Sequence, residues 1–407
     1  MGIKVALLTI GTELTEGLVA DTNSFYLSKE LFKHNYQVRR HLSVGDRFEE
    51  IVRAINELSA DFDVIITTGG LGPTKDDLTR GAIAAAFNKK LSVDNQSMAL
   101  AAETYLHEGA ERVASFPEGA TIIKPSGGTA AGFWLQTDNY LVVSLPGVPA
   151  ELEDMFHRQV LPLLDKLFKP QITSRRRVFK IVNLTEMQVE AQLSDISQDL
   201  SYGLLPRPAE IHLYVTVKSS SPNESDEKLA LIDKQIRDIF GRNLYGIDDE
   251  TLEQVVVKEL TGRKITVSVA ESSTGGLVGS RLASVADASA ILLGGYITYS
   301  YSFKEKMGVP KDILMATGAV SAETAAAMTI HASRQTNSDL AVSITGIAGP
   351  GGATETKPLG LHYIGVGTRE KELLVREFVF KGDRTQVRWQ ASQWALIMLR
   401  EVALNQK

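Results

Sequence analysis

The chain has 407 residues, more than one ordinary hydrophobic core supports, so we expect three domains. With 43% hydrophobic and 23% charged residues, its composition is that of a soluble globular protein. A formal net charge of −6 offers no general attraction to nucleic acid or anionic lipid. The absence of cysteine excludes disulfides, thiolate metal sites and a cysteine nucleophile. No run approaches the roughly 18 apolar residues of a membrane span, so we expect a cytoplasmic protein without membrane partners.

Strand and helix patterns alternate through the first part of the chain. The strand patterns lie at 5–10, 37–44, 64–68 and 140–145, and the helical patterns lie at 22–33 and 48–58. Their order, βαβαβ, predicts a doubly wound α/β domain over residues 1–169. A further helix carries Leu152 and Val160 on one face, and Pro162 should bend or end it.

Two further domains follow. A boundary near Lys169-Pro170 begins a small α+β module over residues 170–248, whose order is compatible with a KH-like fold. Residues 249–407 form another α/β domain. Its strands are predicted at 265–269, 295–299, 340–344 and 362–367, and its helices at 277–282, 322–334 and 385–402.

A turn rich in hydroxyl groups joins a strand to a helix in the last domain. It reads Ala270-Glu271-Ser272-Ser273-Thr274-Gly275-Gly276. Free N–H groups and the helix dipole favour a phosphate or an oxyanion at such a turn, and two glycines allow close approach. An ordinary helix cap rich in Ser and Thr is the alternative interpretation.

Two other segments can meet this turn at the carboxyl ends of parallel strands. One carries Tyr299 and Lys304, and the other is a glycine-rich loop after Ser343 that contains Gly346 and Gly349. A serine needs a base to attack an amide, and none of the seven histidines lies in a recognisable catalytic motif. A desolvated Lys304 can accept the Ser272 proton, and Tyr299 can relay or orient it. Each residue taken alone is also compatible with an ordinary surface lysine or a packed tyrosine.

From about residue 250 onward the sequence resembles the CinA C-terminal domain, the nicotinamide mononucleotide deamidase family called PncC. The shared motifs are Ala-Glu-Ser-x-Thr-Gly-Gly at 270–276, Thr-Tyr-Ser at 298–300, Gly-Ala-Val-Ser at 318–321, Gly-Ile-Ala-Gly-Pro at 346–350, Lys-Pro-Leu-Gly at 357–360 and Gly-Asp-Arg at 382–384. The resemblance implies that Ser272 is the nucleophile and Lys304 its base, and that Tyr299 takes part beside them. It also implies that the substrate is bound by Glu271, Ser273, Thr274, Gly275, Gly276, Thr345, Gly346, Gly349 and Arg384.

The implied reaction converts nicotinamide mononucleotide and water to nicotinic acid mononucleotide and ammonia. It passes through an acyl-enzyme at Ser272, with N–H groups near Ser273 and Thr274 stabilising the oxyanion. No metal or cofactor is needed. Such a reaction belongs to pyridine nucleotide salvage.

The first domain has its own glycine loop, Thr67-Thr68-Gly69-Gly70-Leu71-Gly72-Pro73-Thr74-Lys75-Asp76-Asp77, between a strand and a helix. It is neither a Walker loop nor a complete dinucleotide fingerprint. We expect Gly11, Glu13, Gly69, Gly70, Gly72 and Thr74 to bind a substrate diphosphate. Asp76 and Asp77, with Glu13 as a third oxygen ligand, can hold a hard divalent cation. Alternatively the aspartates only favour the helix N-terminus.

This segment resembles the CinA N-terminal domain, which is related to the molybdopterin-binding MoaB and MogA fold. The motifs are Gly-Thr-Glu-Leu at 11–14, Thr-Gly-Gly-Leu-Gly-Pro-Thr at 68–74 and Leu-Pro-Gly-Val-Pro at 145–149. The resemblance implies hydrolysis of ADP-ribose at its pyrophosphate, dependent on a divalent metal ion with or without a monovalent cation. It also suggests a homodimer.

Two alternatives to a hydrolase remain. One is a molybdopterin-type binding protein or pathway enzyme, in which the serine turn is structural. The other is a competence-associated protein that contacts nucleic acid through the middle module, which the acidic net charge makes unlikely.

Overall fold

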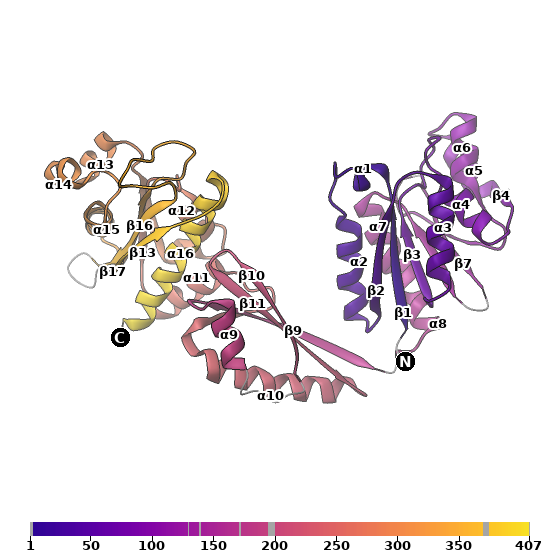
Figure 1. The fold of residues 1–407 in the computed structure, drawn as a ribbon, viewed down its shortest axis with the longest axis horizontal. Coiled ribbons are helices and arrows are strands. Elements are labelled where there is room, and N and C mark those ends of the chain that lie inside the picture. The colour runs from indigo at the N-terminus through magenta and orange to yellow at the C-terminus, as the bar shows by residue number, and fades with distance from the viewer. Residues whose placement is uncertain are drawn as a thin grey trace. The chain divides into compact units, whose positions relative to one another are not determined.

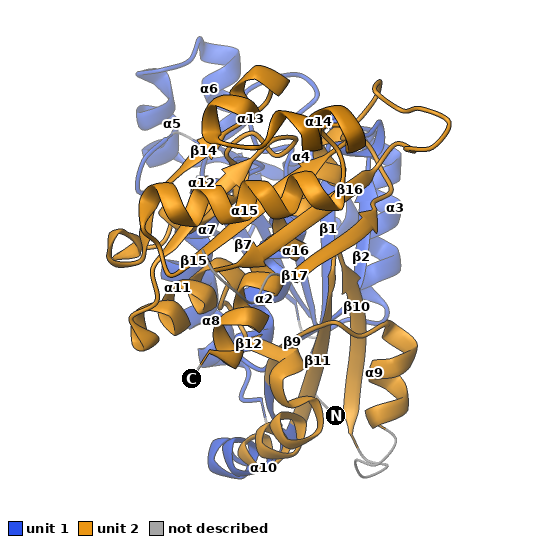
Figure 2. Cartoon of the chain, turned by 90° about the vertical axis from the view of Figure 1, so that its left-hand side faces the viewer, with its two compact units in different colours: residues 1–175, 218–228 blue, residues 176–217, 229–407 orange. Residues whose placement is uncertain are grey.

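The computed structural model of the protein describes residues 3–128, 130–137, 140–170, 172–193, 200–368 and 374–406. These residues cluster into two compact units, Met1–Arg175 with Lys218–Lys228, and Arg176–Val217 with Leu229–Lys407 (Figure 2). The second unit therefore joins most of the middle module to the C-terminal domain. None of the described helices combines the length and the apolar character that crossing a bilayer requires.

The first unit is built on a six-stranded sheet in the order β2-β1-β3-β8-β7-β6 (Figure 1). The strands are β1 Lys4–Ile10, β2 Gln37–Val44, β3 Val64–Thr68, β8 Leu141–Leu145, β7 Gly132–Gln136 and β6 Thr121–Ile123. The first four are parallel, β7 pairs antiparallel with β8, and β6 pairs antiparallel with β7. Because β2 and β3 flank β1 on opposite sides, a crevice opens at the carboxyl ends of β1 and β3, where α/β sheets bind ligands.

Helices cover both faces of this sheet and bury two separate apolar cores. The helices of this unit are α1 Thr12–Thr15, α2 Thr22–Lys33, α3 Phe48–Ser59, α4 Thr79–Ala86, α5 Asn95–Ala102, α6 His107–Ala114, α7 Pro149–Met155 and α8 Leu161–Leu167, with a small hairpin of β4 Leu91–Val93 and β5 Ser115–Pro117. Helices α5 and α6 pack on each other in a small apolar cluster of their own. Pro162 does not end the last helix. One π-helical turn, Phe156–Val160, precedes it, and α8 then starts with Pro162 in its first turn, where a missing N–H costs little.

The middle module has the order β-α-β-β-α-β and a four-stranded sheet, β10-β11-β9-β12. This is the split βαβ arrangement of ferredoxin-like domains. Its elements are β9 Thr173–Val182, α9 Glu186–Leu193, β10 Ser201–Arg207, β11 Glu210–Ser219, α10 Pro222–Phe240 and β12 Leu244–Ile247. The sequence patterns missed β10 and β12, because β10 is exposed on both faces and β12 is only four residues long.

The C-terminal domain has a five-stranded sheet in the order β14-β13-β15-β16-β17. The strands are β13 Val267–Glu271, β14 Leu292–Ile297, β15 Leu340–Gly346, β16 Leu361–Gly367 and β17 Leu374–Val379. The helices are α11 Leu252–Arg263, α12 Leu277–Ala283, α13 Tyr301–Met307, α14 Lys311–Thr317, α15 Ala322–Thr336 and α16 Arg384–Asn405. Strands β14, β13 and β15 are parallel, β16 pairs antiparallel with β15, and β17 pairs antiparallel with β16. The carboxyl ends of β13 and β15 are therefore neighbours.

One local prediction here is wrong. The strand expected at 295–299 ends at Ile297, and Lys304 lies on helix α13 rather than at a strand end. The reason is Ser300, whose hydroxyl accepts a hydrogen bond from the Phe303 N–H and so begins the helix.

Candidate active site

Ser272 and Lys304 meet at the carboxyl edge of the C-terminal sheet. Ser272 follows β13 directly, and the Lys304 Nζ donates to its Oγ at 3.0 Å. The same Nζ donates to the Thr298 carbonyl at 2.6 Å, and the lysine is 1% exposed. Burial lowers the pKa of Lys304 to about 8. A neutral amine next to the serine hydroxyl is therefore accessible near physiological pH, as a general base requires.

The turn at residues 272–276, called the serine turn below, is held from beneath by Glu271. This carboxylate is 1% exposed and accepts the backbone N–H groups of Gly276, Val278 and Gly279 at 3.0, 3.1 and 2.8 Å. Glu271 therefore supports the serine turn and the start of α12, and its role in substrate binding stays a prediction. The first N–H groups of α12 are not free for an anion.

Two other N–H groups in the serine turn remain. The Ser272 N–H donates to the Ile344 carbonyl at 3.0 Å, and the Gly275 N–H donates to the Ser272 carbonyl at 3.1 Å. In the described part of the chain, the N–H groups of Ser273 and Thr274 have no partner. They lie next to Ser272, where an oxyanion hole is needed. The hydroxyls of Ser273 and Thr274 are buried without partners.

Helix α16 contributes two arginines to this edge. Arg384 donates to the Gly349 carbonyl at 2.7 Å and to the Tyr299 hydroxyl at 2.9 Å. Arg388, which the sequence did not single out, donates to the Thr274 carbonyl at 2.6 Å. Tyr299 is 61% exposed, and its hydroxyl accepts from Arg384 and makes no hydrogen bond to Ser272 or Lys304 among the described residues.

Thr345 does not line the reaction centre. It is fully buried, and its hydroxyl donates to the Ala319 carbonyl at 2.5 Å. Lys357 donates to the Thr317 and Val320 carbonyls, each at 2.7 Å, so both side chains hold the loop between α14 and α15. The structure gives Thr345 this supporting role, and its part in substrate binding stays a prediction.

Gly346 is the last residue of β15, and Gly349 lies in the glycine-rich loop that follows the strand. A Cβ on Gly346 would lie 2.2 Å from the ring of His362, which is buried on β16. The chain therefore needs glycine at this position for packing rather than for substrate contact. Gly275 and Gly276 take the left-handed backbone conformation, at φ 62° and 96°.

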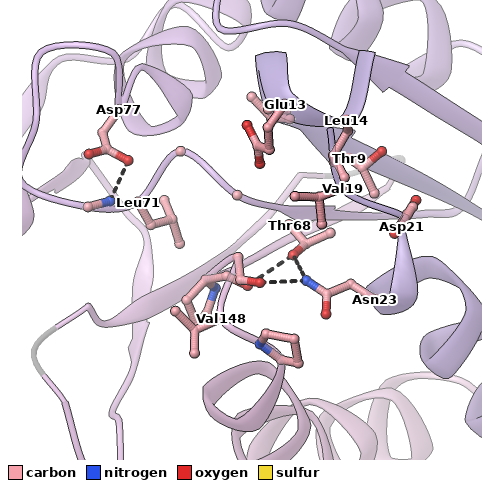
Figure 3. Close-up of a pocket in the computed structure, with 18 of the residues that line it drawn as sticks. Thr9, Glu13, Leu14, Val19, Asp21, Asn23, Thr68, Leu71, Asp77 and Val148 are labelled. Atoms are coloured by element: carbon pink, nitrogen blue, oxygen red, sulfur yellow. Dashed lines mark hydrogen bonds between the residues drawn. The ribbon is translucent and has the colours of Figure 1, made fainter. Parts of the chain in front are cut away.

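A second candidate site lies in the first unit. The loops after β1, β3 and β8 line a cavity of about 400 Å³ (Figure 3). The Asn23 amide bridges the Thr68 hydroxyl at 3.0 Å and the Gly147 carbonyl at 2.9 Å, so it ties two of these loops together. Gly11, Glu13, Gly69, Gly70 and Gly72, which the sequence analysis assigned to a diphosphate, line this cavity. A Cβ on Gly69 would lie 2.0 Å from the Ile10 carbonyl, so only glycine allows the loops to approach.

Asp77 holds the glycine loop. Its carboxylate accepts the Gly72 N–H at 2.7 Å, the Thr74 N–H at 2.8 Å and the Thr74 hydroxyl at 2.6 Å. Thr74 therefore contacts Asp77 and does not line the cavity, and its role in substrate binding stays a prediction. Arg80, a buried residue that the sequence analysis missed, donates to the Leu71 and Ala131 carbonyls at 2.9 and 3.2 Å. It supports the loop from the other side.

The cavity is acidic. Its carboxylates are Glu13, Asp21, Asp46, Asp76, Asp77 and Glu151, and no lysine or arginine lines it. Such oxygen donors suit a hard divalent cation. Among the described residues, however, no three His, Cys, Asp or Glu side chains converge on one point, and Asp77 is engaged in the loop. As placed, the predicted ligands Asp76 and Asp77 do not form a metal site.

Three family models match the chain in succession. They are a probable molybdopterin binding domain over residues 6–166, the KH domain of damage-inducible protein CinA over 176–246, and the CinA C-terminal domain over 249–403. A competence-damage inducible protein of Caldicellulosiruptor saccharolyticus is 38% identical over 98% of this chain and 99% of its own length. The chain belongs to the CinA family.

Other relatives match the whole chain or a part of it. A CinA-like protein of Kosmotoga olearia is 36% identical over 99% of both chains. The crystal structure of a competence/damage inducible protein from Agrobacterium tumefaciens is 38% identical, covers 38% of this chain and 94% of its own, and has a TM-score of 0.37.

The middle module of this CinA chain contains Gly203, Gly241 and Gly246 but no Gly-x-x-Gly, the loop with which KH domains clamp a nucleic-acid backbone.

Proposed function

We propose that the C-terminal domain is an amidohydrolase that converts nicotinamide mononucleotide and water to nicotinic acid mononucleotide and ammonia. The observation that carries this proposal is the 3.0 Å contact between the buried Lys304 Nζ and the Ser272 Oγ. Burial lowers the pKa of Lys304 to about 8, so a substantial fraction of the amine is neutral near physiological pH. This neutral amine supports a role as the base that activates Ser272.

The reaction begins when neutral Lys304 accepts the Ser272 proton and the Oγ attacks the carboxamide carbon. The N–H groups of Ser273 and Thr274 stabilise the oxyanion. Lys304 then returns the proton to the amide nitrogen, the C–N bond breaks, and ammonia leaves an ester on Ser272. Water, deprotonated by Lys304, hydrolyses this ester and restores the serine. The lysine and the backbone supply every proton and charge contact, so this cycle has no metal or cofactor step.

The substrate's phosphate suits the exposed side of the site. Arg384 is exposed, and its hydrogen bonds to Gly349 and Tyr299 hold the guanidinium in place. A phosphate group can therefore bind to this fixed positive charge. We infer that Arg384 selects a nucleotide over free nicotinamide.

The decisive experiment measures ammonia release from nicotinamide mononucleotide without added metal. Ser272→Ala and Lys304→Ala are expected to fall to background while remaining folded. Lys306→Ala is the matched control, because Lys306 lies on the same helix but over the Phe303 ring, 5.5 Å from its centroid. Full activity in Ser272→Ala, or an inactive parent, would overturn the proposal.

The first unit supports a second activity, hydrolysis of ADP-ribose at its pyrophosphate. The observation behind it is a cavity of about 400 Å³ with glycine loops and six carboxylates but no lysine or arginine. A diphosphate would be repelled there unless divalent cations came with it. AMP formation from ADP-ribose, measured in Ser272→Ala with and without Mg²⁺, tests this activity. Metal-independent binding of a pterin would instead favour the molybdopterin-type alternative.

We also infer that the protein is a homodimer. Helix α13 exposes Tyr301 at 54% and Phe303 at 55%, and Ile297 of the edge strand β14 is 56% exposed. Apolar side chains gathered at one edge are typical of an interface. Light scattering on the purified protein should give twice the chain mass of 44.3 kDa, and a monomer would refute the inference.

A further inference from the structure

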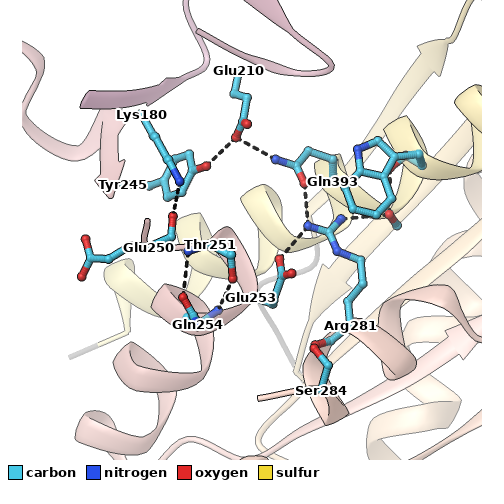
Figure 4. A network of polar contacts seen from close by, with 12 residues as sticks. Lys180, Glu210, Tyr245, Glu250, Thr251, Glu253, Gln254, Arg281, Ser284 and Gln393 are labelled. Atoms are coloured by element: carbon cyan, nitrogen blue, oxygen red, sulfur yellow. Dashed lines mark hydrogen bonds and ion pairs between the residues drawn. The ribbon is translucent and has the colours of Figure 1, made fainter. Parts of the chain in front are cut away.

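One buried arginine, Arg281, joins helices α12 and α16 (Figure 4). From α12, its guanidinium donates to the Ser392 hydroxyl at 2.9 Å and to the Gln393 amide oxygen at 2.7 Å, both on α16. It also pairs with Glu253 of α11 at 2.8 Å. Losing one partner of a buried charge leaves that charge unsatisfied. These contacts therefore fix how the two helices lie along each other.

The same two helices carry the groups that surround the catalytic serine. Helix α12 begins directly after the serine turn, while α16 sends Arg388 to the Thr274 carbonyl and Arg384 to the Gly349 carbonyl. The serine turn has its own support in Glu271. A shift of α16 along α12 would thus move both arginines relative to Ser272.

The middle module reaches this junction through Glu210, the first residue of β11. Its carboxylate accepts the Gln393 amide N–H at 2.9 Å, the Tyr245 hydroxyl at 2.5 Å and the His212 ring N–H at 2.7 Å. A carboxylate only accepts, so it binds the NH2 end of Gln393 and leaves the carbonyl end for Arg281. Without Glu210 the amide is free to turn, and its NH2 group would then face the guanidinium, donor against donor.

We propose that Glu210 of the middle module is a positioning residue for the amidohydrolase site and acts through Gln393 and Arg281. The proposal rests on the proposed function of the C-terminal domain. It gives the module a part in the reaction, since the module holds the arginines of α16 in register with Ser272. Glu210 itself touches neither Ser272 nor Lys304 among the contacts of the described residues.

The kinetic test replaces Glu210 in the full-length chain. Glu210→Ala should raise KM and lower kcat/KM for nicotinamide mononucleotide by between about twofold and thirtyfold, the range of coupling through a packed network. A raised KM is diagnostic, because partial unfolding lowers kcat alone. Glu210→Gln keeps one acceptor oxygen and should recover part of the loss.

Asp233→Ala is the matched control. Asp233 is a mostly buried carboxylate of the same module, but it accepts from Arg177 at 3.0 Å and from Arg237 at 2.6 Å, both within the module. Its loss should leave KM unchanged. An equal rise of KM in Glu210→Ala and Asp233→Ala would show general loosening of the module and overturn the proposal.

Two further measurements examine the path itself. In a Gln393→Ala background, Glu210→Ala should have no additional effect, whereas additive losses would overturn the proposal. Hydrogen exchange of residues 271–283 should rise severalfold in Glu210→Ala and stay unchanged in Asp233→Ala. This readout needs no amidase activity. An inactive parent would refute the proposed function alone, whereas unchanged exchange in Glu210→Ala would refute the role of Glu210.

Discussion

The protonation of Lys304 makes a sharp prediction about the pH dependence of the amidase. With a pKa lowered to about 8, the neutral fraction of the side chain is about one in a hundred at pH 6, one in ten at pH 7 and one half at pH 8. Since only the neutral amine can accept the Ser272 proton, kcat should rise about fiftyfold between pH 6 and pH 8 and then level off. A protonated lysine acting as an acid would give the opposite slope.

The assay is ammonia release at saturating nicotinamide mononucleotide in buffers of constant ionic strength. The quantity is kcat, because the substrate phosphate also titrates near pH 6 and would distort kcat/KM. Thermal unfolding at each pH shows whether a fall in kcat comes from unfolding of the protein or from protonation of Lys304. A kcat that is flat from pH 6 to pH 8.5, or that falls across this range, would refute the base role of Lys304 in the 3.0 Å contact with Ser272.

Three other perturbations follow from the same contacts. Lys304→Met should stabilise the protein, because lowering the lysine pKa from 10.5 to about 8 in the folded state costs roughly 3 kcal/mol of folding free energy. This cost is present in full below pH 8 and is lost as the pH rises from 8 to 10.5. In urea denaturation, the gain in stability should therefore be largest at pH 7 and shrink toward pH 10.5. Arg388→Ala removes the donor to the Thr274 carbonyl and should lower kcat about tenfold with little change in KM, as measured against a lysine replacement at the same position. Asp77→Ala should destabilise the first unit by about 2 kcal/mol while ammonia release is unchanged, and a parallel loss of deamidase activity would contradict the independence of the two sites.

Sequence patterns predicted most of the architecture, because parallel strands that are buried on both faces leave continuous apolar runs. Strands β1, β3 and β13 are of this kind, and each leads into a loop that lines a candidate site. Where an element depends on one polar side chain, prediction failed. Ser300 caps the N-terminus of α13 shortly after β14 ends, and the spacing of apolar residues in the sequence does not indicate such a cap.

The candidate site divides along similar lines. Ser272 and Lys304 were predicted, and the structure brings their side chains into hydrogen-bond contact. Glu271 and Thr345 were assigned to substrate because they lie in the same motifs, but both are buried and hold backbone groups of neighbouring loops. Arg388 and Arg80 were missed because each acts through a carbonyl distant in sequence. A motif shows which residues occur together, and it does not distinguish those that touch the ligand from those that hold the loop.

The two proposed sites offer a phosphate group opposite electrostatic surroundings. Both lie where parallel strands on either side of a central strand leave a crevice, and both use glycine loops to bring backbone close to a ligand. The C-terminal edge places Arg384 and Arg388 beside its serine turn, so a single phosphate can be held by side chains alone. The charged side chains that line the N-terminal cavity are all carboxylates, and the nearby buried Arg80 donates to two backbone carbonyls. Any diphosphate there must bring its own cations, so its affinity should depend on divalent metal, whereas the deamidase should be indifferent to it.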